Sequence, residues 1–325
     1  MTHDLNDTSR IVLHARDPSE QASSFGLLHQ SYEQLSIGAF SGSLVAVSAN
    51  DILVFQETLD QSVFQTGVSD AGYITIAAAC ELSDQGYWNG RHIDLDSVVA
   101  FTPGREFELR TPAHAVCFGV SLAPSLLRSI SPEHPTDYWE KFFARNDCWS
   151  DAGRLRGDLQ SRIARVLQDA SAASAQAERA ADLVELRELA IDYFGSLIER
   201  CSIGGHKLRV ESYPRIARRA RATMLERLSE PLSVTDLCTE LGCSRRSLQY
   251  AFESIYGLGP VAYLRAMRLA EARRRLTGGK RGTTVQDVAA AVGFNHLPRF
   301  AQEYARMFGE RPSASLAAHR AGGQS

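Results

Sequence analysis

The sequence lacks the features of secreted, membrane-spanning and disulfide-stapled proteins. It contains no run of about 18 apolar residues, so no membrane-spanning helix is predicted. The first residues, MTHDLNDTSR, are polar and acidic and differ from a secretory signal peptide. The six cysteines include no CxxC pair and lie mostly in apolar segments, which indicates small buried side chains rather than disulfide partners or zinc ligands. Together these absences predict a cytoplasmic protein.

Fingerprints of catalytic and cofactor sites are also missing. The sequence has no GxSxG nucleophile turn, no phosphate-binding P-loop and no GxGxxG dinucleotide motif. No cofactor is therefore predicted, and the sequence favours a protein that is not an enzyme.

Length and charge indicate two domains of different kinds. A chain of 325 residues is long enough for about two domains, and its 44% hydrophobic content can supply their cores. Residues 207–325 contain 20 Lys and Arg against 10 Asp and Glu, a net charge of +10, whereas the whole chain has a net charge of −3. Basic segments bind phosphate backbones by releasing counterions. The asymmetry favours a nucleic-acid-binding module joined to an acidic module, with merely solvated Arg-rich helix faces as the alternative.

The basic segment contains two copies of one pattern. Residues 234–243, VTDLCTELGC, align with residues 285–294, VQDVAAAVGF, and the agreement continues after one extra residue in the second copy. In each copy a short helix-like apolar segment meets a glycine, an N-cap candidate and a second such segment. The glycines are Gly242 and Gly293, and the N-cap candidates are Ser244 and Asn295. This order predicts two helix-turn-helix units, whose second helices fit the DNA major groove, with ordinary αα-hairpins as the alternative.

The segment between the copies, PVAYLRAMRLAEARRRLTGG (residues 260–279), has the apolar spacing of one helix that ends at paired glycines. With this helix and both repeats, residues 213–318 resemble the DNA-binding domain of the AraC/XylS family of bacterial transcription regulators, in which a long helix bridges two helix-turn-helix units. The stretches AYLRAMRLAEARRRL and VAAAVGFNHLPRFAQEYARMFGERPSA carry the resemblance. The start of the second recognition helix, HLPRF, departs from the small or polar residues usual in the family. It is most similar to the branch that contains ethanolamine-responsive regulators.

The resemblance implies which side chains meet DNA. Leu248 and Phe252 face inward in the first unit, which leaves the opposite face of the helix for base edges; there Arg suits guanine and Gln suits adenine. Pro298 is expected in the first turn of the second recognition helix, where its missing N–H costs no hydrogen bond. The predicted DNA-binding residues are Arg245, Arg246, Gln249 and Tyr250 in the first unit and His296, Arg299, Gln302 and Arg306 in the second.

The first 125 residues have the period of β-strands. Short apolar runs such as SLVAVSA, DILVFQE, YITIAAAC and HAVCFGVSL alternate with turns rich in Gly, Asn, Asp and Pro, which predicts an antiparallel sandwich or barrel. The run DSVVAFTPGREFELRTP resembles the cupin-type jelly roll that serves as the effector domain in many members of the family. The predicted fold class is α+β multidomain: an N-terminal cupin-like antiparallel β-barrel, a helical connector and an all-α C-terminal double helix-turn-helix domain.

The β-domain is expected to bind a small-molecule effector rather than a metal. Metal-dependent cupins use a His-x-His pair, a Glu and a later His, and the histidines of this region show no such spacing. Small barrels hold small molecules among their inward-facing side chains. Trp88, Arg91, His92 and Arg105 lie near predicted strand ends and turns, so they are ligand-binding candidates at a mouth, with ordinary rim residues as the alternative.

Residues 126–204 are predicted to form a helical connector. The stretches RLRGDLQSRIARVLQ and ADLVELRELAIDYFGSLIERC have apolar residues spaced at i, i+3 and i+4. In the resembling family, helices at this place pack on the barrel and often form a dimer interface, so packing within the chain and a homodimer are both open. The segment CSIGGHKLRVESYP has paired glycines and a proline and contains the predicted linker, residues 205–212.

The sequence thus predicts a sequence-specific DNA-binding transcription regulator. Residues 1–125 form its effector domain and residues 213–325 its DNA-binding domain, with helix-turn-helix units at about 234–256 and 285–308. The resemblance implies an activator that binds double-stranded promoter DNA and RNA polymerase and is controlled by a small molecule. The alternatives are a non-specific nucleic-acid-binding protein and a cupin-type enzyme or small-molecule carrier with a helical appendage.

Overall fold

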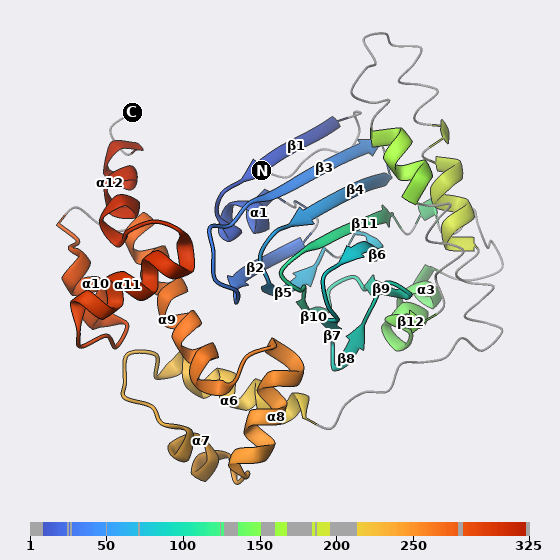
Figure 1. Ribbon diagram of the computed structural model, residues 1–325. Coiled ribbons are helices and arrows are strands. Elements are labelled where there is room, and N and C mark those ends of the chain that lie inside the picture. The colour runs from blue at the N-terminus through green and yellow to red at the C-terminus, as the bar shows by residue number, and fades with distance from the viewer. Residues whose placement is uncertain are drawn as a thin grey trace. The chain divides into compact units, whose positions relative to one another are not determined.

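The computed structural model in Figure 1 divides the chain into two compact units. The β-unit comprises Met1–Tyr32, Ser41–Asp60 and Gln65–Val210, and the helical unit comprises Glu33–Phe40, Gln61–Phe64 and Glu211–Ser325. The predicted linker, residues 205–212, lies outside the residues that the structure describes. The described residues are 9–24, 26, 28–49, 51–70, 72–123, 125–126, 136–150, 160–167, 184–185, 187–195, 213–278 and 282–322.

Two sheets make up most of the β-unit (Figure 1). The seven-stranded sheet runs in the order β1 (Ser9–Ala15), β3 (Gly42–Ala49), β4 (Ile52–Leu59), β11 (Ala115–Leu122), β6 (Ile74–Leu82), β9 (Ser97–Phe101) and β12 (Cys148–Ser150). The five-stranded sheet runs in the order β2 (Leu28–Gln34), β5 (Val63–Ser69), β10 (Glu106–Arg110), β7 (Gly86–Trp88) and β8 (Arg91–Ile93). Neighbouring strands of the larger sheet are antiparallel, as the alternating sequence pattern predicts.

The predicted antiparallel β-domain is therefore present, but the strands do not form one closed barrel. Among the described residues, the larger sheet ends at β1 and β12 and the smaller sheet ends at β2 and β8. Periodicity identifies the strands and their two faces, but it does not specify which strands pair. Whether the strands close into a barrel depends on those pairings, so the local sequence pattern could not predict it.

The alternation along β4 separates two cores. Ile52 and Val54 belong to a cluster on the outer face of the larger sheet, together with Trp139 and Phe143 of α3 (Thr136–Arg145) and with apolar residues of helical segments 160–167 and 187–195. Leu53 and Phe55 belong to a second cluster that includes residues of both sheets, among them Leu28 and Trp88. The helices predicted as a connector thus bury their apolar faces against the β-unit itself.

The predicted helical connector also contains a strand. Residues Cys148–Ser150 form β12, which pairs antiparallel with β9 and so extends the larger sheet at its edge. Cys148 and Trp149 are buried, and this non-local burial outweighs the helical tendency of the surrounding sequence. A uniformly helical segment 126–204 is therefore corrected to helices interrupted by an edge strand.

The helical unit has the predicted two pairs of helices and the helix that joins them. Its core residues include the predicted Leu248 and Phe252 in the first pair and Phe300, Tyr304 and Met307 in the second. The helices are α6 (Pro214–Glu226), α7 (Val234–Leu241), α8 (Arg245–Tyr256), α9 (Pro260–Thr277), α10 (Val285–Ala291), α11 (Leu297–Phe308) and α12 (Pro312–Gly322).

A single glycine in the larger sheet makes room for an aromatic side chain. Gly119 of β11 lies opposite Phe55 of β4, and a Cβ atom at this position would overlap the phenyl ring and lie 2.9 Å from the carbonyl oxygen of Ile76. We expect Gly119→Ala to lower the free energy of unfolding of the β-unit by about 1–3 kcal/mol, the usual cost of overpacking a core.

Urea unfolding followed by tryptophan fluorescence measures this effect, because the chain's three tryptophans all belong to the β-unit. Gly72→Ala is the matched control, since Gly72 is exposed and an added Cβ would meet only the carboxylate of Asp70, at 3.2 Å. An unchanged urea midpoint in Gly119→Ala, equal to that of the control, would contradict the assigned role of this glycine.

Candidate nucleic-acid interface

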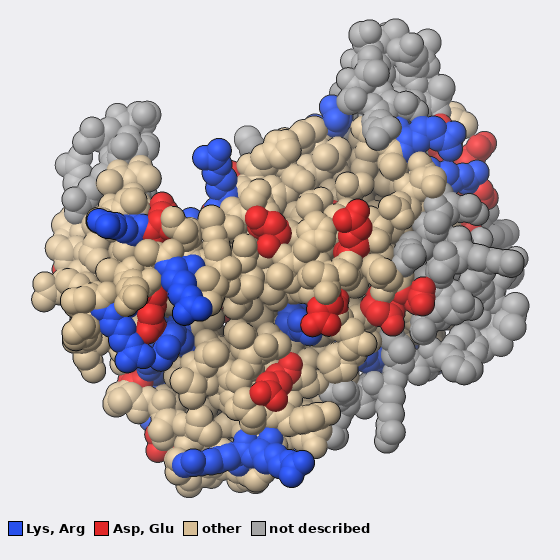
Figure 2. Space-filling model, in the orientation of Figure 1, with Lys and Arg blue, Asp and Glu red and all other residues tan. Residues whose placement is uncertain are grey.

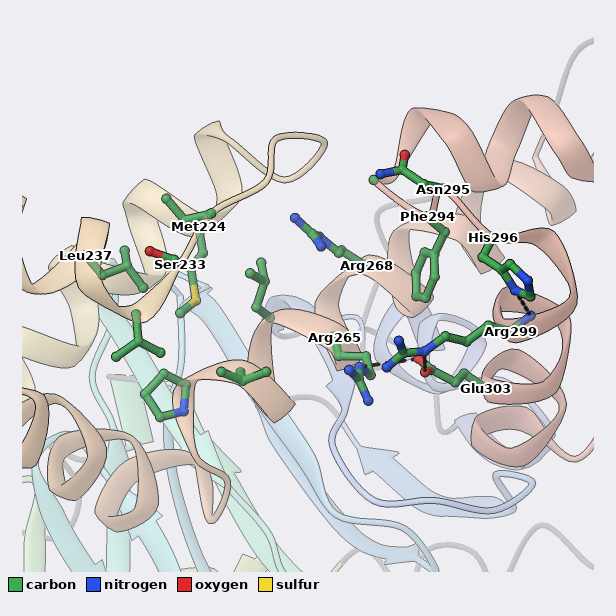
Figure 3. A pocket seen from close by; sticks show the side chains of 16 residues that line it. Met224, Ser233, Leu237, Arg265, Arg268, Phe294, Asn295, His296, Arg299 and Glu303 are labelled. Atoms are coloured by element: carbon green, nitrogen blue, oxygen red, sulfur yellow. Dashed lines mark hydrogen bonds and ion pairs between the residues drawn. The ribbon is translucent and has the colours of Figure 1, made fainter.

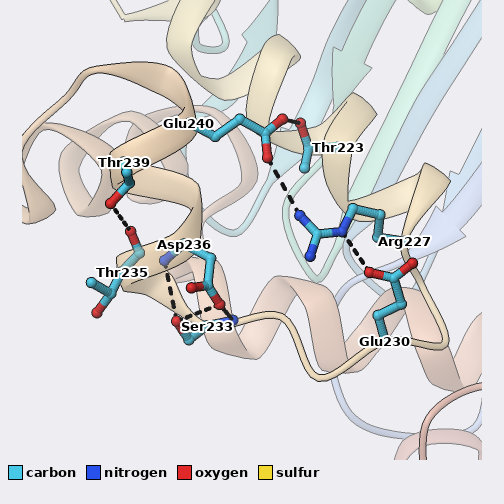
Figure 4. Close-up of polar contacts among 8 residues, drawn as sticks. All are labelled: Thr223, Arg227, Glu230, Ser233, Thr235, Asp236, Thr239 and Glu240. Atoms are coloured by element: carbon cyan, nitrogen blue, oxygen red, sulfur yellow. Dashed lines mark hydrogen bonds and ion pairs between the residues drawn. The ribbon is translucent and has the colours of Figure 1, made fainter.

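The first helix-turn-helix unit, α7 and α8, is fixed by local capping. The Ser233 hydroxyl accepts a hydrogen bond from the backbone N–H of Asp236 at 3.2 Å, and the Asp236 carboxylate accepts one from the N–H of Ser233 at 2.9 Å, which forms a capping box (Figure 4). The hydrogen bonds from Ser233 hold the pKa of Asp236 below its usual value. The chain then turns at Gly242, whose φ is 62°, and Ser244 caps α8 by accepting from the N–H of Ser247 at 3.0 Å.

Polar contacts attach α6 to α7 in the same region. The Thr223 hydroxyl donates to Glu240 at 2.9 Å, and the Arg227 guanidinium donates to Glu240 at 3.4 Å and to Glu230 at 2.7 Å (Figure 4). Hydrogen bonding to Glu230 raises the pKa of the Arg227 guanidinium. These contacts fix the helix that supports the first recognition helix.

The outer face of α8 carries the predicted DNA-binding side chains of the first unit. All four residues, Arg245, Arg246, Gln249 and Tyr250, are exposed. Arg245 donates to the Thr235 hydroxyl at 2.6 Å, Gln249 donates to Glu253 at 2.6 Å, and the Tyr250 ring lies 5.0 Å from the ring of Tyr213. Within the described residues Arg246 makes no hydrogen bond or ion pair, so its guanidinium is available to an external acceptor.

The second unit, α10 and α11, repeats this construction with a different cap. The Thr284 hydroxyl caps α10 by accepting from the N–H of Asp287 at 3.1 Å, and the turn residue Gly293 has a φ of 82°. The N-cap of α11 is His296 and not the predicted Asn295, because His296 has the extended backbone of a cap and its Nδ1 accepts from the N–H of Arg299 at 3.2 Å. Pro298 lies in the first turn of α11, as predicted.

The exposed face of α11 carries the predicted residues of the second unit. His296, Arg299, Gln302 and Arg306 are all exposed. Arg299 pairs with Glu303 at 2.8 Å, and Arg265 of α9 approaches the other carboxylate oxygen of Glu303 at 3.3 Å. Gln302 and Arg306 make no hydrogen bond or ion pair with other described residues. Like Arg246, they are available to an external hydrogen-bonding partner.

A groove of about 330 Å³ lies between the start of α7, the first half of α9 and the start of α11 (Figure 3). Its wall contains three guanidinium groups and one carboxylate, which gives it a positive charge. Arg268 donates to the backbone carbonyl oxygens of Leu228 and Glu230, and burial lowers the pKa of its guanidinium. The charged residues of the wall are Arg265, Arg268, Arg299 and Glu303. The positive charge suits a phosphate group.

Sequence reasoning assigned no contact role to Arg265 and Arg268. Both lie on the joining helix α9, for which the sequence pattern predicted only a buried apolar face. Their spacing of three residues places them on neighbouring positions of one helix face, and this signal could have identified them. In Figure 2, Lys and Arg side chains of the helical unit gather over α7 and α8 at the lower edge and over α9 to α11 at the left.

The four residues predicted to bind an effector do not form one site, because each has different neighbours in the β-unit. Trp88 is fully buried between Phe101 and Phe107, with ring centroids 4.7 and 5.9 Å away, so it does not lie on an exposed rim. Arg91 pairs with Asp147 at 2.8 Å, and Arg105 is exposed and donates to the carbonyl oxygen of Ala144 at 3.5 Å. His92 is half-buried on β8. The β-unit has a pocket of about 60 Å³ that is lined by residues of both sheets, among them Phe55 and Glu57. None of the four predicted residues lines this pocket.

The described part of the chain shows neither a metal-binding cluster nor a membrane-spanning helix. It contains no group of three or more His, Cys, Asp or Glu side chains placed to hold a metal ion. None of its helices is both long enough and apolar enough to span a bilayer. Its cysteines are free thiols, and burial raises the pKa of Cys148 to about 12.

Comparison with known proteins identifies the helical unit. Residues 237–318 match the family model described as a helix-turn-helix domain. A probable thc operon regulatory protein of Rhodococcus erythropolis is 35% identical over 104 residues, 32% of this chain and 31% of that protein. A XylDLEGF operon transcriptional activator of Pseudomonas putida is 34% identical over 96 residues, 29% of this chain and 61% of that protein. The chain thus spans about a third of the first curated relative and less than two thirds of the second.

Solved structures also match about a third of this chain, and one of them is given as an example. It is that of a probable AraC family transcriptional regulator from Rhodopseudomonas palustris, which is 31% identical with a TM-score of 0.31; the match covers 32% of this chain and 97% of that one. Residues 237–318, which match the family model, run from within α7 to α12 and include α8, α9, α10 and α11 entire. The carboxyl-terminal part of this chain is an AraC/XylS-type double helix-turn-helix DNA-binding domain.

Proposed function

We propose that the protein is a sequence-specific DNA-binding transcription regulator, in which α8 and α11 read successive segments of the major groove. The observation that carries the proposal is that both recognition helices pack on one helix, α9, and present exposed Arg and Gln side chains. The positive groove lined by Arg265, Arg268 and Arg299 would hold the phosphate backbone between the two reading helices.

The proposal extends to activation and to control by a small molecule. A relative in Pseudomonas putida is named a transcriptional activator, which supports the proposal that this protein activates transcription. An activator of transcription would act in the cytoplasm and would have RNA polymerase as a partner. The relatives are named as regulators, which supports a regulator rather than an enzyme. The pocket lined by both sheets of the β-unit supports a cupin-like effector domain. The connector helices are proposed to contribute to a homodimer.

Selection of bound sequences from a random DNA pool with the purified protein, at fixed salt concentration, tests this function. A regulator enriches one motif, and random duplex competes poorly with it. A non-specific binder enriches none, because its affinity comes from phosphate contacts alone. Absence of salt-sensitive DNA binding would overturn the proposal in favour of an enzyme or carrier.

Replacement of Arg246 tests base reading by the first unit. We expect Arg246→Ala to weaken binding to the selected site by about 1–3 kcal/mol and to relax selectivity at one base pair, because a bidentate contact to a base edge is lost. Arg10→Ala is the matched control, since it removes one exposed arginine from β1 of the β-unit. Equal weakening on all sequences would show that Arg246 contacts only phosphate.

Replacement of His296 separates its capping role from a DNA contact. His296→Ala should lower the stability of the helical unit by about 0.5–2 kcal/mol, because α11 loses its N-cap, whereas His296→Asn keeps a capping side chain. Thermal unfolding by circular dichroism measures both variants. If DNA binding falls equally in both variants while only His296→Ala is destabilised, the imidazole contacts DNA. Equal destabilisation of both would refute the cap.

The spacing of the two subsites tests whether both units read DNA. A rigid joining helix predicts subsites about 10 base pairs apart on one face of the duplex. Inserting about five base pairs between them should abolish specific binding, because one subsite moves to the opposite face. The same insertion outside the site is the control. Footprints of unchanged affinity after the internal insertion would mean that only one unit reads sequence.

A further inference from the structure

A single carboxylate holds two arginines of the positive groove together. Glu303 of α11 accepts a hydrogen bond on Oε1 from Nε of Arg299, one turn earlier on the same helix, at 2.8 Å. Its Oε2 lies 3.3 Å from Nε of Arg265, on the joining helix α9 (Figure 3). Among the residues that line the groove, Glu303 is the one acidic side chain. These three residues form a bridge between a recognition helix and the helix on which it packs, named here the arginine bridge.

The carboxylate of the bridge is less accessible to water than its two partners. The side chain of Glu303 is 18% exposed, whereas the side chains of Arg299 and Arg265 are 59% and 45% exposed. Its buried Oε2 accepts no hydrogen bond, so the charge of Arg265 compensates this oxygen. A carboxylate with little access to water is costly unless cations lie beside it. The burial of Glu303 therefore favours a fixed position for both arginines.

Both pairs use Nε, which leaves the Nη edge of each guanidinium group open. A guanidinium group has five N–H donors, of which one is on Nε. Among the described residues, the Nη atoms of Arg299 and Arg265 make no hydrogen bond. Two positive charges meet one negative charge in the bridge, so one positive charge has no acidic partner. The open edges and the remaining charge suit the oxygens of a phosphate group.

The third arginine of the groove is held in a different way. Arg268 donates from Nε to the carbonyl oxygen of Leu228 at 2.8 Å and from Nη2 to that of Glu230. The turn residue Gly293 leaves space for it, because a Cβ atom there would lie 3.1 Å from Cζ of Arg268. Backbone carbonyl groups hold Arg268 without help from Glu303. It therefore serves as an internal comparison for the two arginines of the bridge.

We propose that Glu303 is a positioning residue for DNA binding, which holds Arg299 and Arg265 as a preordered pair for one phosphate of the DNA backbone. The inference rests on the proposed function and adds to it an acidic residue in the DNA-binding surface. Ordering one long side chain at the moment of binding weakens an interface roughly 2- to 10-fold. A bridge that is formed before DNA arrives avoids this loss.

Charge alone predicts the opposite effect of removing Glu303. A carboxylate repels phosphate, so its loss from a DNA-binding surface should strengthen binding to any duplex. Loss of a positioning residue should weaken binding, because two mutually repelling arginines must then be ordered by the DNA itself. The direction of the change in affinity therefore separates the two roles.

Fluorescence anisotropy with the full chain and a labelled duplex measures this direction. We expect Glu303→Gln to weaken DNA binding roughly 2- to 10-fold, although it removes a negative charge. Glu226→Gln is the matched control, because Glu226 is exposed on α6 and makes no hydrogen bond or ion pair with other described residues. The control should bind as tightly as the unchanged chain or more tightly. Binding by Glu303→Gln as tight as that of the control would overturn the proposal.

A double-mutant cycle distinguishes positioning from a merely structural role. In a chain with Arg265→Gln and Arg299→Gln no pair remains to be positioned, so adding Glu303→Gln should leave binding unchanged or strengthen it. In a chain with Arg268→Gln the bridge is intact, so adding Glu303→Gln should weaken binding as it does in the unchanged chain. The same loss in all backgrounds would show that Glu303 only supports the fold, and it would overturn the proposal.

Circular dichroism checks the folding of every variant. If Glu303→Gln does not fold, the cycle between Arg265→Gln and Arg299→Gln decides instead. Two arginines that bind one phosphate as a pair lose less together than the sum of their separate losses. Additive losses would contradict the paired role.

Measurement on the selected site and on a random duplex separates this inference from the proposed function. Phosphate contacts are independent of sequence, so the bridge should act on both duplexes. A chain that selects no motif but shows the coupling on random duplex overturns the sequence-specific regulator alone. A chain that selects a motif but shows no coupling overturns the role of Glu303 alone.

Discussion

The packing of both helix-turn-helix pairs on a single helix determines how the helical unit can work. On one side of α9, Tyr263 contacts Phe252 and Tyr256 of α8, with ring centroids 5.4 and 4.1 Å apart, and receives a hydrogen bond from Arg221 of α6 at 2.9 Å. On the other side, Ala272 and Leu276 share a core cluster with α10, α11 and α12. A helix of 18 residues is about 27 Å long, so α8 and α11 are held at a fixed separation.

The arginines of the helical unit divide into those with and those without a carboxylate partner. On the second half of α9, Arg274 and Arg275 pair with Glu271, and Arg273 pairs with Glu310, so these three cations share two carboxylates within the unit. Arg246 and Arg306 have no such partner among the described residues. Cations without intramolecular partners can neutralise phosphates and release counterions, whereas paired ones must first give up an acidic neighbour.

The two faces of the larger sheet in the β-unit differ in what packs against them. Trp139, Phe143 and Phe194 of the helices pack on the outer face of the larger sheet, so the apolar residues of that face are buried. The inner face carries Glu57 and Cys117, register neighbours on β4 and β11, next to a cavity. Burying a polar group among apolar side chains is costly unless it is hydrogen-bonded, and Glu57 accepts hydrogen bonds from Tyr32 and Gln21.

The sequence by itself determined the parts of the protein that depend on neighbours along the chain. The Ser233 and Ser244 caps, the turn at Gly242, the position of Pro298 and the inward face of each recognition helix all follow from contacts within about four residues. The tertiary structure alone decided that β12 pairs with β9, that Trp88 is buried, that Arg265 and Arg299 share Glu303, and that Glu57 faces a cavity. These features join residues far apart in the chain, and no local period specifies which strands or helices meet.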